Sequence, residues 1–505
     1  MTPFDESAAP QNRWTPAAAG ARAFIDPRPI VLVIGALVFM LGVAMLLPAF
    51  ADLVVGDEDW QVFAVSAAFT MSCGALMFLA TRGSGQGLST RQAFVMTALV
   101  WIMLALFAAL PFYWSGVVPS FTDAYFESIS GLTTTGATVI TGLDDLPPGM
   151  QLWRGIMQWL GGLGIIVMAV SVLPMLQIGG MQLFKAEAFD TPEKILPRAQ
   201  QISGFMTLIF LNLTGLCMLA YLIAGMEFLD AVVHAMTTVA TGGFSTRDAS
   251  LGHFDSVAVD MIATTFMIIG SLPFLLYVQA LQGSWKPLGT DGQVRAFLTL
   301  LICTILFAWS LEISYGVRAG WDALRFATVN VTSILTGTGY ATTAYDGWGP
   351  AAVAFFFFLM FIGGCAGSTS CGIKIFRFQV LFQNVKQHLA RVLYPNGIFT
   401  QKFNGRPIAD DVTSAVMSFF FLYIFTFAIS ATALSIAGVD TLTALSGAGS
   451  AISNVGPGLG ALIGPAGNYQ GLPDVAKWIL LITMLVGRLE LFTVLVVLSP
   501  RFWRA

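Results

Sequence analysis

The chain has 505 residues, of which 56% are hydrophobic and only 10% are charged, and its formal net charge is -4. Soluble proteins carry about a quarter charged residues, so this composition excludes a soluble globular protein and indicates a polytopic membrane protein. The small net charge gives no indication of nucleic-acid binding. The five cysteines lie within apolar segments, and their spacing fits neither a disulfide framework nor a metal cluster.

The N-terminal part of the chain predicts a tail followed by a helical hairpin. Residues 1–28 are polar and lack the apolar core of a signal peptide, so we expect a cytoplasmic tail. Two charge-free runs follow at 29–51 and 60–81, and each is long enough to cross about 30 Å of hydrocarbon. An acidic turn separates them. Residues 29–90 are therefore predicted to form an N-terminal two-helix domain.

From residue 91 onward one unit recurs four times: a long apolar helix, a short segment that opens with Asp, a Gly-bearing loop and a second apolar helix. The pore repeats are residues 91–198, 199–290, 291–407 and 408–505. The first helices are predicted near 92–115, 203–225, 295–316 and 412–437. The second helices are predicted near 151–176, 256–282, 349–382 and 474–498.

The segments between these helices open with Asp123, Asp230, Asp322 and Asp440. Each is too short to span a bilayer, so we expect re-entrant half-helices. An Asp in the first turn suits the positive end of the helix dipole, which places each start near the outer surface. The expected fold is an all-α polytopic membrane protein, with an N-terminal two-helix hairpin and four helix/re-entrant loop/helix repeats around a central pore.

The four filter loops, defined as 133–138, 240–246, 336–342 and 454–459, follow the half-helices and align on four glycines. Glycine permits a positive φ, which an extended loop needs in order to present its carbonyl groups to a cation. These carbonyl oxygens can replace the water that the cation loses. Four such loops around one axis predict a selectivity filter formed by Thr134, Thr135, Gly136, Thr241, Gly242, Gly243, Gly337, Thr338, Gly339, Asn454, Val455 and Gly456. The alternative is a set of ordinary loop glycines and helix-capping threonines.

The segment from 347 to 373 is charge-free and contains the start of GGCAGSTSCGIK, residues 363–374, which we call the gating loop. So many Gly and Ser/Thr residues do not suit a lipid-facing helix, because unsatisfied backbone costs several kcal/mol per group in hydrocarbon. We expect a flexible obstruction in the pore, formed by Gly363, Gly364, Gly367, Ser368, Thr369, Ser370, Gly372 and Lys374. Cys365 and Cys371 are expected to be small packed residues.

Arg488 lies near the middle of the last predicted helix. A buried arginine is costly there unless it faces water or a partner, and Glu490 lies on a different helical face. We expect Arg488 to project into the pore below the filter, to meet the gating loop and to act with it as a gate. The alternative, a structural arginine bonded to carbonyls between helices, is compatible with this role.

Most of the 24 Lys and Arg residues lie in segments that the repeat arrangement places inside, which predicts cytoplasmic termini and outward-facing filter loops. The basic connection 374–406 is a candidate landing surface for a regulatory partner, although its charges could equally reflect orientation alone. Residues 447–453 lack the strand and the acidic residue of a dinucleotide fingerprint, so we assign them to the fourth half-helix. His234 is expected to be a packed or water-facing side chain and not a proton relay.

Ten apparent spans, four filter repeats, the gating loop and LVGRLELFTVLVVLSP at 485–500 resemble the TrkH/TrkG branch of the Trk/Ktr/HKT potassium transporter superfamily. The resemblance covers nearly the whole chain past residue 29, and the N-terminal hairpin is similar to the extra domain of the Trk branch. It implies four filter glycines, an intramembrane gating loop and a pore arginine at 488. Potassium is implied as the cation because all four filter positions are glycine. Relatives often have Gly or Ala where this chain has Cys371.

The same resemblance implies a homodimer in the bacterial inner membrane, seated on a cytosolic TrkA-type regulatory ring that binds nucleotide. We expect no cofactor in this chain, potassium as its substrate, the lipid bilayer as its surroundings and no nucleic acid as a partner. The sequence is compatible with both channel-like and proton-coupled uptake. The alternative function is a proton- or sodium-coupled secondary transporter of cations. No nucleophile, base or metal cluster indicates an enzyme.

Overall fold

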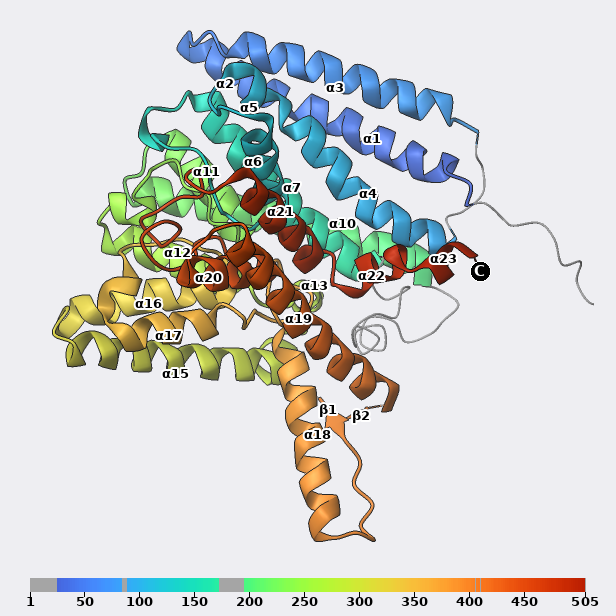
Figure 1. Cartoon of the computed structure of the whole chain (residues 1–505), viewed down its shortest axis with the longest axis vertical. Helices are drawn as coiled ribbons and strands as arrows, with labels where there is room; N and C mark the ends of the chain where they lie inside the picture. Colours follow the sequence, from blue (N-terminus) through green and yellow to red (C-terminus); the bar gives the residue numbers. More distant parts are fainter. Residues whose placement is uncertain (1–24, 84–88, 172–194, 405, 409, 505) are drawn as a thin grey trace, which may run out of the picture.

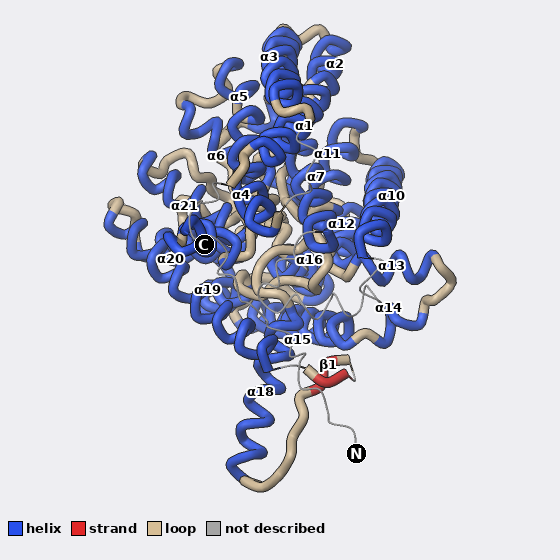
Figure 2. Tube along the Cα trace, turned by 90° about the vertical axis from the view of Figure 1, so that its right-hand side faces the viewer, coloured by secondary structure: helices blue, strands red, loops and turns tan. Residues whose placement is uncertain are grey.

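The computed structural model describes residues 25–504 except 84–88, 172–194, 405 and 409. Most of the tail predicted at 1–28 therefore lies outside the described residues. Helices account for nearly all regular structure (Figure 2), and the two strands β1 (Lys402–Phe403) and β2 (Arg406–Pro407) form one small antiparallel pair. Short 3-10 helices lie at Leu143–Asp145, Ser250–His253 and Tyr345–Trp348.

The N-terminal hairpin has the predicted form. Helices α1 (Arg28–Ala44) and α2 (Leu46–Val55) run on nearly continuously and return through α3 (Trp60–Ala80). Gly35 and Gly74 face each other across the hairpin, and a Cβ atom at either one would come closer than 3.0 Å to the backbone of the other helix. Such small residues permit close packing of helices in membranes. Figure 1 shows α1 and α3 side by side at one edge of the molecule.

The four repeats contain the predicted first helices. They are α4 (Thr90–Ala108) with α5 (Leu110–Ser115), α10 (Ile195–Ile223), α15 (Gly292–Ser314) and α19 (Asp410–Ile436). Side-chain caps fix two of these starts. Ser89 and Gln92 form a capping box at α4, and the Asp291 side chain accepts hydrogen bonds from two backbone N–H groups at the start of α15.

The four half-helices are also present as predicted. They are α6 (Phe121–Leu132), α11 (Phe228–Val239), α16 (Gly320–Thr336) and α20 (Thr441–Ser453). The longest has 17 residues, whereas crossing the hydrocarbon takes about 20. Residues 447–453, which superficially resemble a nucleotide-binding motif, lie within α20. Asp440 caps this helix by accepting a hydrogen bond from the Thr443 backbone N–H.

The predicted second helices are continuous only in the first repeat, where α7 spans Pro148–Ser171. The prediction of single helices at 256–282 and 474–498 is wrong. Helices α12 (Val257–Gly270) and α13 (Phe274–Leu281) meet at 89°, and α21 (Asp474–Arg488) and α22 (Phe492–Leu498) meet at 110°. In the third repeat, α17 (Pro350–Leu359) ends well before α18 (Ile375–Leu393) begins.

Each break has a local cause. Pro273 precedes α13 and has no backbone N–H to continue the ladder of α12, and Glu490 has a φ of 56° between α21 and α22. Within the described residues, six helices are long and apolar enough to cross a membrane, or eight if each bent pair counts as one span. The ten spans predicted from the sequence are reached if α7 and the interrupted pair α17 and α18 are added to these eight.

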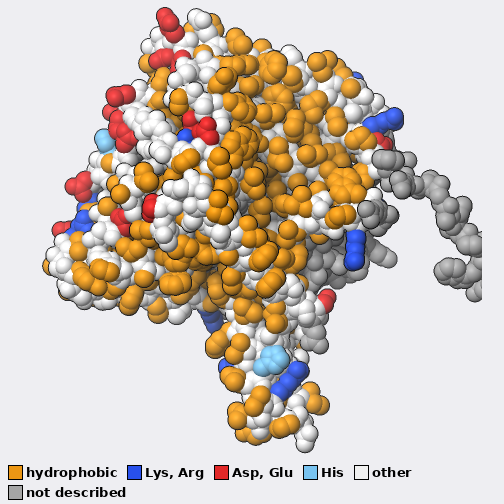
Figure 3. All heavy atoms as spheres, in the orientation of Figure 1, with side chains coloured by type: hydrophobic (Ala, Val, Ile, Leu, Met, Phe, Trp, Pro, Cys, Tyr) orange, Lys and Arg blue, Asp and Glu red, His pale blue; other side chains and the backbone are white. Residues whose placement is uncertain are grey.

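Two further short helices complete the chain: α14 (Lys286–Thr290) and α23 (Pro500–Arg504). Helix α18 projects well beyond the rest of the molecule, with the β1–β2 pair beside its base (Figures 1 and 2). Figure 3 shows that hydrophobic side chains cover most of the face in view, as expected for a surface in contact with lipid.

Candidate functional site

The four filter loops share one backbone conformation. Their glycines have φ values of 83°, 80°, 89° and 107° at Gly136, Gly243, Gly339 and Gly456. The residues two positions earlier, Thr134, Thr241, Gly337 and Asn454, also have positive φ, at 53°, 49°, 72° and 51°. Positive φ at the same two positions gives the four loops the same path, and backbone carbonyls of such loops are the ligands from which cation filters are built.

Non-glycine residues with positive φ cost about 1–2 kcal/mol each. Thr134, Thr241 and Asn454 all carry this strain, and such strain persists only where the surrounding structure imposes it. The sequence predicted the conformational freedom of the glycines but not the strain at these three residues. These residues directly follow the half-helices, where a left-handed residue commonly ends a helix.

The four loops also close into a ring. A Cβ atom added to any of the four glycines would lie closer than 3.0 Å to a carbonyl oxygen of the next loop. The contacts run from Gly136 to Gly242 O, from Gly243 to Thr338 O, from Gly339 to Val455 O and from Gly456 to Thr135 O. Each repeat therefore meets the next in chain order, and the fourth meets the first. Any side chain at these positions would push the ring apart.

Side chains behind the loops hold the ring in place. Gln158 of α7 donates from Nε2 to Gly242 O at 2.5 Å and accepts from the Phe244 N–H at 3.0 Å. Asn454 donates from Nδ2 to Thr135 Oγ1 and to Met484 O, each at 2.9 Å. Gln158 was not among the predicted site residues, although a polar side chain within an apolar helix is a signal for such a role.

Buried ion pairs surround the filter loops. Arg154 is 1% exposed and donates to Glu127 Oε1 at 2.8 Å and to Ser245 O at 2.7 Å. Lys477 pairs with Asp123 at 2.6 Å, so the fourth repeat is tied to the first half-helix. Arg154 and Lys477 belong to the minority of basic residues that the repeat arrangement places outside. Their real role is internal, because a buried charge requires a partner.

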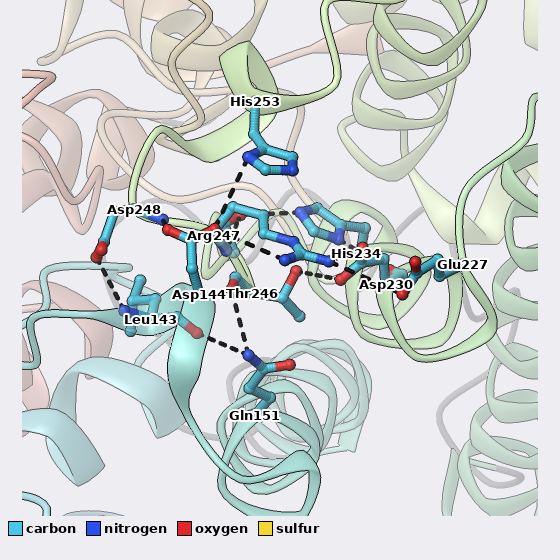
Figure 4. Close-up of polar contacts among 11 residues, drawn as sticks. Leu143, Asp144, Gln151, Glu227, Asp230, His234, Thr246, Arg247, Asp248 and His253 are labelled. Carbon is cyan, nitrogen blue, oxygen red and sulfur yellow. Dashed lines mark hydrogen bonds and ion pairs between the residues drawn. The ribbon is translucent and has the colours of Figure 1, made fainter.

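A hollow lies over the ring and is lined by all four filter glycines, together with Arg154 and Arg247. Figure 4 shows how Arg247 is held there. It donates to Asp230 Oδ2 at 2.8 Å and lies 3.7 Å from Asp144 Oδ1. Thr246 donates to the other Asp230 oxygen at 2.6 Å. The hydrogen bond with Asp230 raises the pKa of Arg247, and the two carboxylates offset its positive charge in this hollow.

His234 in Figure 4 is fully buried on α11. Its Nδ1 lies 2.8 Å from Asp230 O and its Nε2 lies 3.0 Å from Ser245 Oγ. Both ring nitrogens therefore have partners within the protein. This agrees with the prediction of a packed histidine.

The gating loop contacts all four repeats directly beneath the filter loops. In the second repeat, Thr369 donates from Oγ1 to Gly270 O at 2.9 Å; in its own repeat, Ser370 donates from Oγ to Thr336 O at 2.6 Å. Cys371 Sγ lies 3.5 Å from Thr134 Oγ1 of the first filter loop and accepts a hydrogen bond from Arg488 in the fourth repeat.

The two limbs of the gating loop meet in a narrow neck. Gly363 N donates to Ile373 O at 3.0 Å, and Ile375 N donates to Gly364 O at 3.1 Å. A Cβ atom at Gly363 would collide with the carbonyl of Cys371, so glycine is required for this approach. Within the second limb, Lys374 donates from Nζ to Ser370 O.

The gating loop also fills the break between α12 and α13. Cys365 N donates to Ser271 O at 3.0 Å, Thr369 N donates to Gly270 O at 3.1 Å, and Phe274 N donates to Gly367 O at 2.9 Å. Backbone groups freed by a broken helix must find partners at membrane depth. The loop of the third repeat supplies them to the second, so the two interruptions support each other.

Arg488 ends α21 and is 3% exposed. It donates to Cys371 Sγ at 2.7 Å and to Gly161 O at 3.0 Å, and its Cζ lies 5.7 Å from the Trp101 ring centroid. Arg488 therefore contacts the gating loop, as predicted. It also bonds to a helix carbonyl, as predicted for a structural arginine. Cys371 is buried, in agreement with the prediction of a packed residue, and its sulfur in addition accepts a hydrogen bond from Arg488.

Glu490 pairs with Arg377 at 2.5 Å. This pairing agrees with the prediction that Glu490 does not neutralise Arg488. Arg377 is fully buried, and its Cζ lies 3.7 Å from the Phe419 ring centroid. The break in the fourth repeat is thereby fixed to the start of α18, just after the gating loop.

Apolar spans that enclose a ring of four backbone loops define a membrane transport protein and not an enzyme. The profile of the TrkH family, described as cation transport protein, matches residues 59–504. The chain belongs to this family of multi-pass membrane proteins, as the resemblance in its residues predicted.

Individual relatives agree over nearly the whole chain. The Trk system potassium uptake protein TrkI of Halomonas elongata is 44% identical, over 94% of this chain and 97% of its own. The Trk system potassium uptake protein TrkH of Escherichia coli is 36% identical, over 94% and 99%. The crystal structure of the potassium transporter TrkH from Vibrio parahaemolyticus superposes with a TM-score of 0.88 at 36% identity, covering 95% of this chain and 100% of that one.

Proposed function

We propose that this chain takes up potassium across the bacterial inner membrane through the ring of filter loops. The observation that carries the proposal is the cyclic contact of each filter glycine with a carbonyl oxygen of the next loop. Backbone carbonyls can replace the hydration shell of potassium. The names of the relatives, Trk system potassium uptake proteins, support the same cation.

We also propose that the gating loop and Arg488 form the gate. The support is their position, since Cys371 lies between Arg488 and Thr134 at the inner side of a filter loop. A guanidinium at this depth opposes cations electrostatically, and the loop obstructs them sterically. Opening requires that the hydrogen bonds of Thr369, Ser370 and Cys371 exchange for others.

Control by a cytosolic TrkA-type nucleotide-binding ring, and assembly as a homodimer, complete the proposal. Their support is the projecting helix α18, on which Phe382, Val385, Leu389 and Val392 are 64%, 55%, 60% and 78% exposed. Their spacing of three or four residues gives one apolar face, and an exposed face of this kind indicates a protein partner. Both termini would lie in the cytoplasm, on the side of α18.

Cation flux into liposomes that contain the purified full-length chain tests the function. Potassium and sodium are compared at fixed voltage without a pH gradient. Faster entry of potassium that scales with voltage supports a channel-like pathway. Potassium movement only with a proton gradient would favour the coupled alternative. If neither cation moves, even with the regulatory subunit present, the filter proposal is overturned.

A further inference from the structure

A large apolar cavity lies between the N-terminal hairpin and the first repeat, with a volume of about 820 Å³. Its walls come from α1, α2, α4 and α7, and Leu132 at the end of half-helix α6 adds to them. None of the described residues that line it is charged. The hydroxyl of Thr97 in its wall already donates to Ala93 O at 2.8 Å. The cavity therefore offers little to a polar ligand.

Its position determines what can fill it. Water needs polar partners, and an empty space of this size would lose the dispersion contacts of its whole lining. Helices α1 and α4 belong to membrane spans, and Met40 and Leu47 in its walls are 65% and 58% exposed. The medium at this surface is hydrocarbon. Ligand pockets typically measure about 300–1,000 Å³, so this one has room for a chain-shaped ligand.

We propose that the cavity is a binding site for one acyl chain of a bilayer lipid, and that the bound chain stabilises the closed arrangement of Arg488. Trp101 and Gly161 are part of the lining. The Trp101 ring lies 5.7 Å from Arg488 Cζ, and the Gly161 carbonyl accepts a hydrogen bond from Arg488. A chain in the cavity supports these two contacts from behind. This second part rests on the gate role proposed above.

The binding site is tested on the full-length chain in vesicles that contain phospholipid with a photoreactive acyl chain. A Cβ atom at Gly164 would lie 3.9 Å from the Trp101 ring, which is ordinary van der Waals contact, and Gly164 lines the cavity, so Gly164→Leu is chosen to fill it. We expect labelling of α4 and α7 to fall several-fold in Gly164→Leu. Gly215→Leu on α10, where a Cβ atom meets nothing within 4 Å, should leave this labelling unchanged.

Val100→Phe fills the cavity from α4 and tests the same point if Gly164→Leu does not fold. Equal labelling in the wild type and in both filled variants would overturn the site. Cross-links from α4 or α7 to another segment of the chain or to a second copy, in place of lipid, would also overturn it.

The coupling is tested by potassium flux in vesicles of straight-chain and methyl-branched lipids, because a branched chain enters a narrow cavity poorly. We expect wild-type flux to be about fivefold higher in branched lipid, a ratio typical of coupled sites, and Gly164→Leu to abolish this dependence. Lipid-independent wild-type flux, with labelling intact, would overturn the coupling alone. Unchanged flux in Arg488→Ala would refute the gate itself and leave the binding site standing.

Discussion

The filter loops and the gating loop lie in contact, yet they are built on opposite principles. The filter is a ring to which all four repeats contribute the same backbone geometry, with positive φ at the glycine and two residues before it. The gating loop is a single insertion in the third repeat. It is held by different groups in each repeat, including Gly270 in the second and Arg488 in the fourth.

This difference has a physical reason. A dehydrated cation needs oxygen ligands on all sides, which a repeated backbone provides with little dependence on side chains. A gate must have two states of similar free energy, and a loop held by separable side-chain contacts can exchange them. The repeats are thus alike where the ion is proposed to bind and different where the gate is proposed to move. The variants below test this division.

The largest effect is expected from Gly136→Ser. Its φ of 83° and the contact with Gly242 O leave no room for a side chain, and strain with overpacking costs about 3 kcal/mol. We expect potassium flux to fall about a hundredfold, and the potassium-to-sodium flux ratio to shrink. Gly142→Ser is the control, because Gly142 has a φ of 70° but open space around it. An unaltered ratio in Gly136→Ser would count against the ring.

Arg488→Ala should act in the opposite direction. Losing the hydrogen bonds to Cys371 and Gly161 removes about 1.5–3 kcal/mol of charge-assisted interaction. We expect flux to rise about tenfold with weaker dependence on the regulatory partner and an unchanged ion ratio. Arg82→Ala removes an exposed charge at the end of α3 and serves as the control. Flux equal to that of the wild type would remove Arg488 from the gate.

Cys371→Ala sharpens the same point, because it removes one acceptor and leaves the bond from Arg488 to Gly161 in place. A single weak hydrogen bond of about 0.5–1 kcal/mol predicts a rise in flux of about threefold. Cys371→Ser should restore most of the wild-type behaviour. Cys365→Ala is the matched control, because Cys365 lies in the same loop but packs among hydrophobic side chains. An equal rise in both alanine variants would show that the sulfur contact is irrelevant.

The smallest effect is expected at the scaffold. Asp440 caps α20, and its hydrogen bonds to Thr443 lower its pKa. Asp440→Ala should cost about 1 kcal/mol of stability, measured by thermal unfolding in detergent, with no change in the flux ratio. Because the pKa of Asp440 is lower in the folded state, its ionised form stabilises the fold at pH values above the unfolded-state pKa. This stabilisation is lost as the pH falls through the folded-state pKa. This part of the acid destabilisation should be missing in the variant.

Asp322→Ala is the control for the cap, because Asp322 lies in the first turn of α16 but is not its N-cap. If the two variants lose equal stability, the capping bond is not the cause. A changed ion ratio in Asp440→Ala would contradict the separation between scaffold and filter.

The sequence alone determined the class of the protein, the hairpin, the half-helices and the register of the filter glycines. These follow from local properties. Apolar length sets what can cross a bilayer, an early Asp marks the start of a helix, and glycine recurs where φ must be positive. The gating loop was equally visible, since its composition conflicts with a lipid-facing helix.

Only the tertiary structure decided where the second helices break and which polar groups meet. Apolar composition fixes the depth of a segment but not its continuity, so it did not predict the breaks after Gly270 and Arg488, although Pro273 was a signal for the first of them. The contact of Arg488 with the gating loop was predicted, but its acceptor, Cys371 Sγ, was not. The partners of Arg154 lie on α6 and in a filter loop, and no spacing rule connects them. Their pairing follows from membrane burial, because each polar group removed from water must bond to whichever group the folded chain brings within reach.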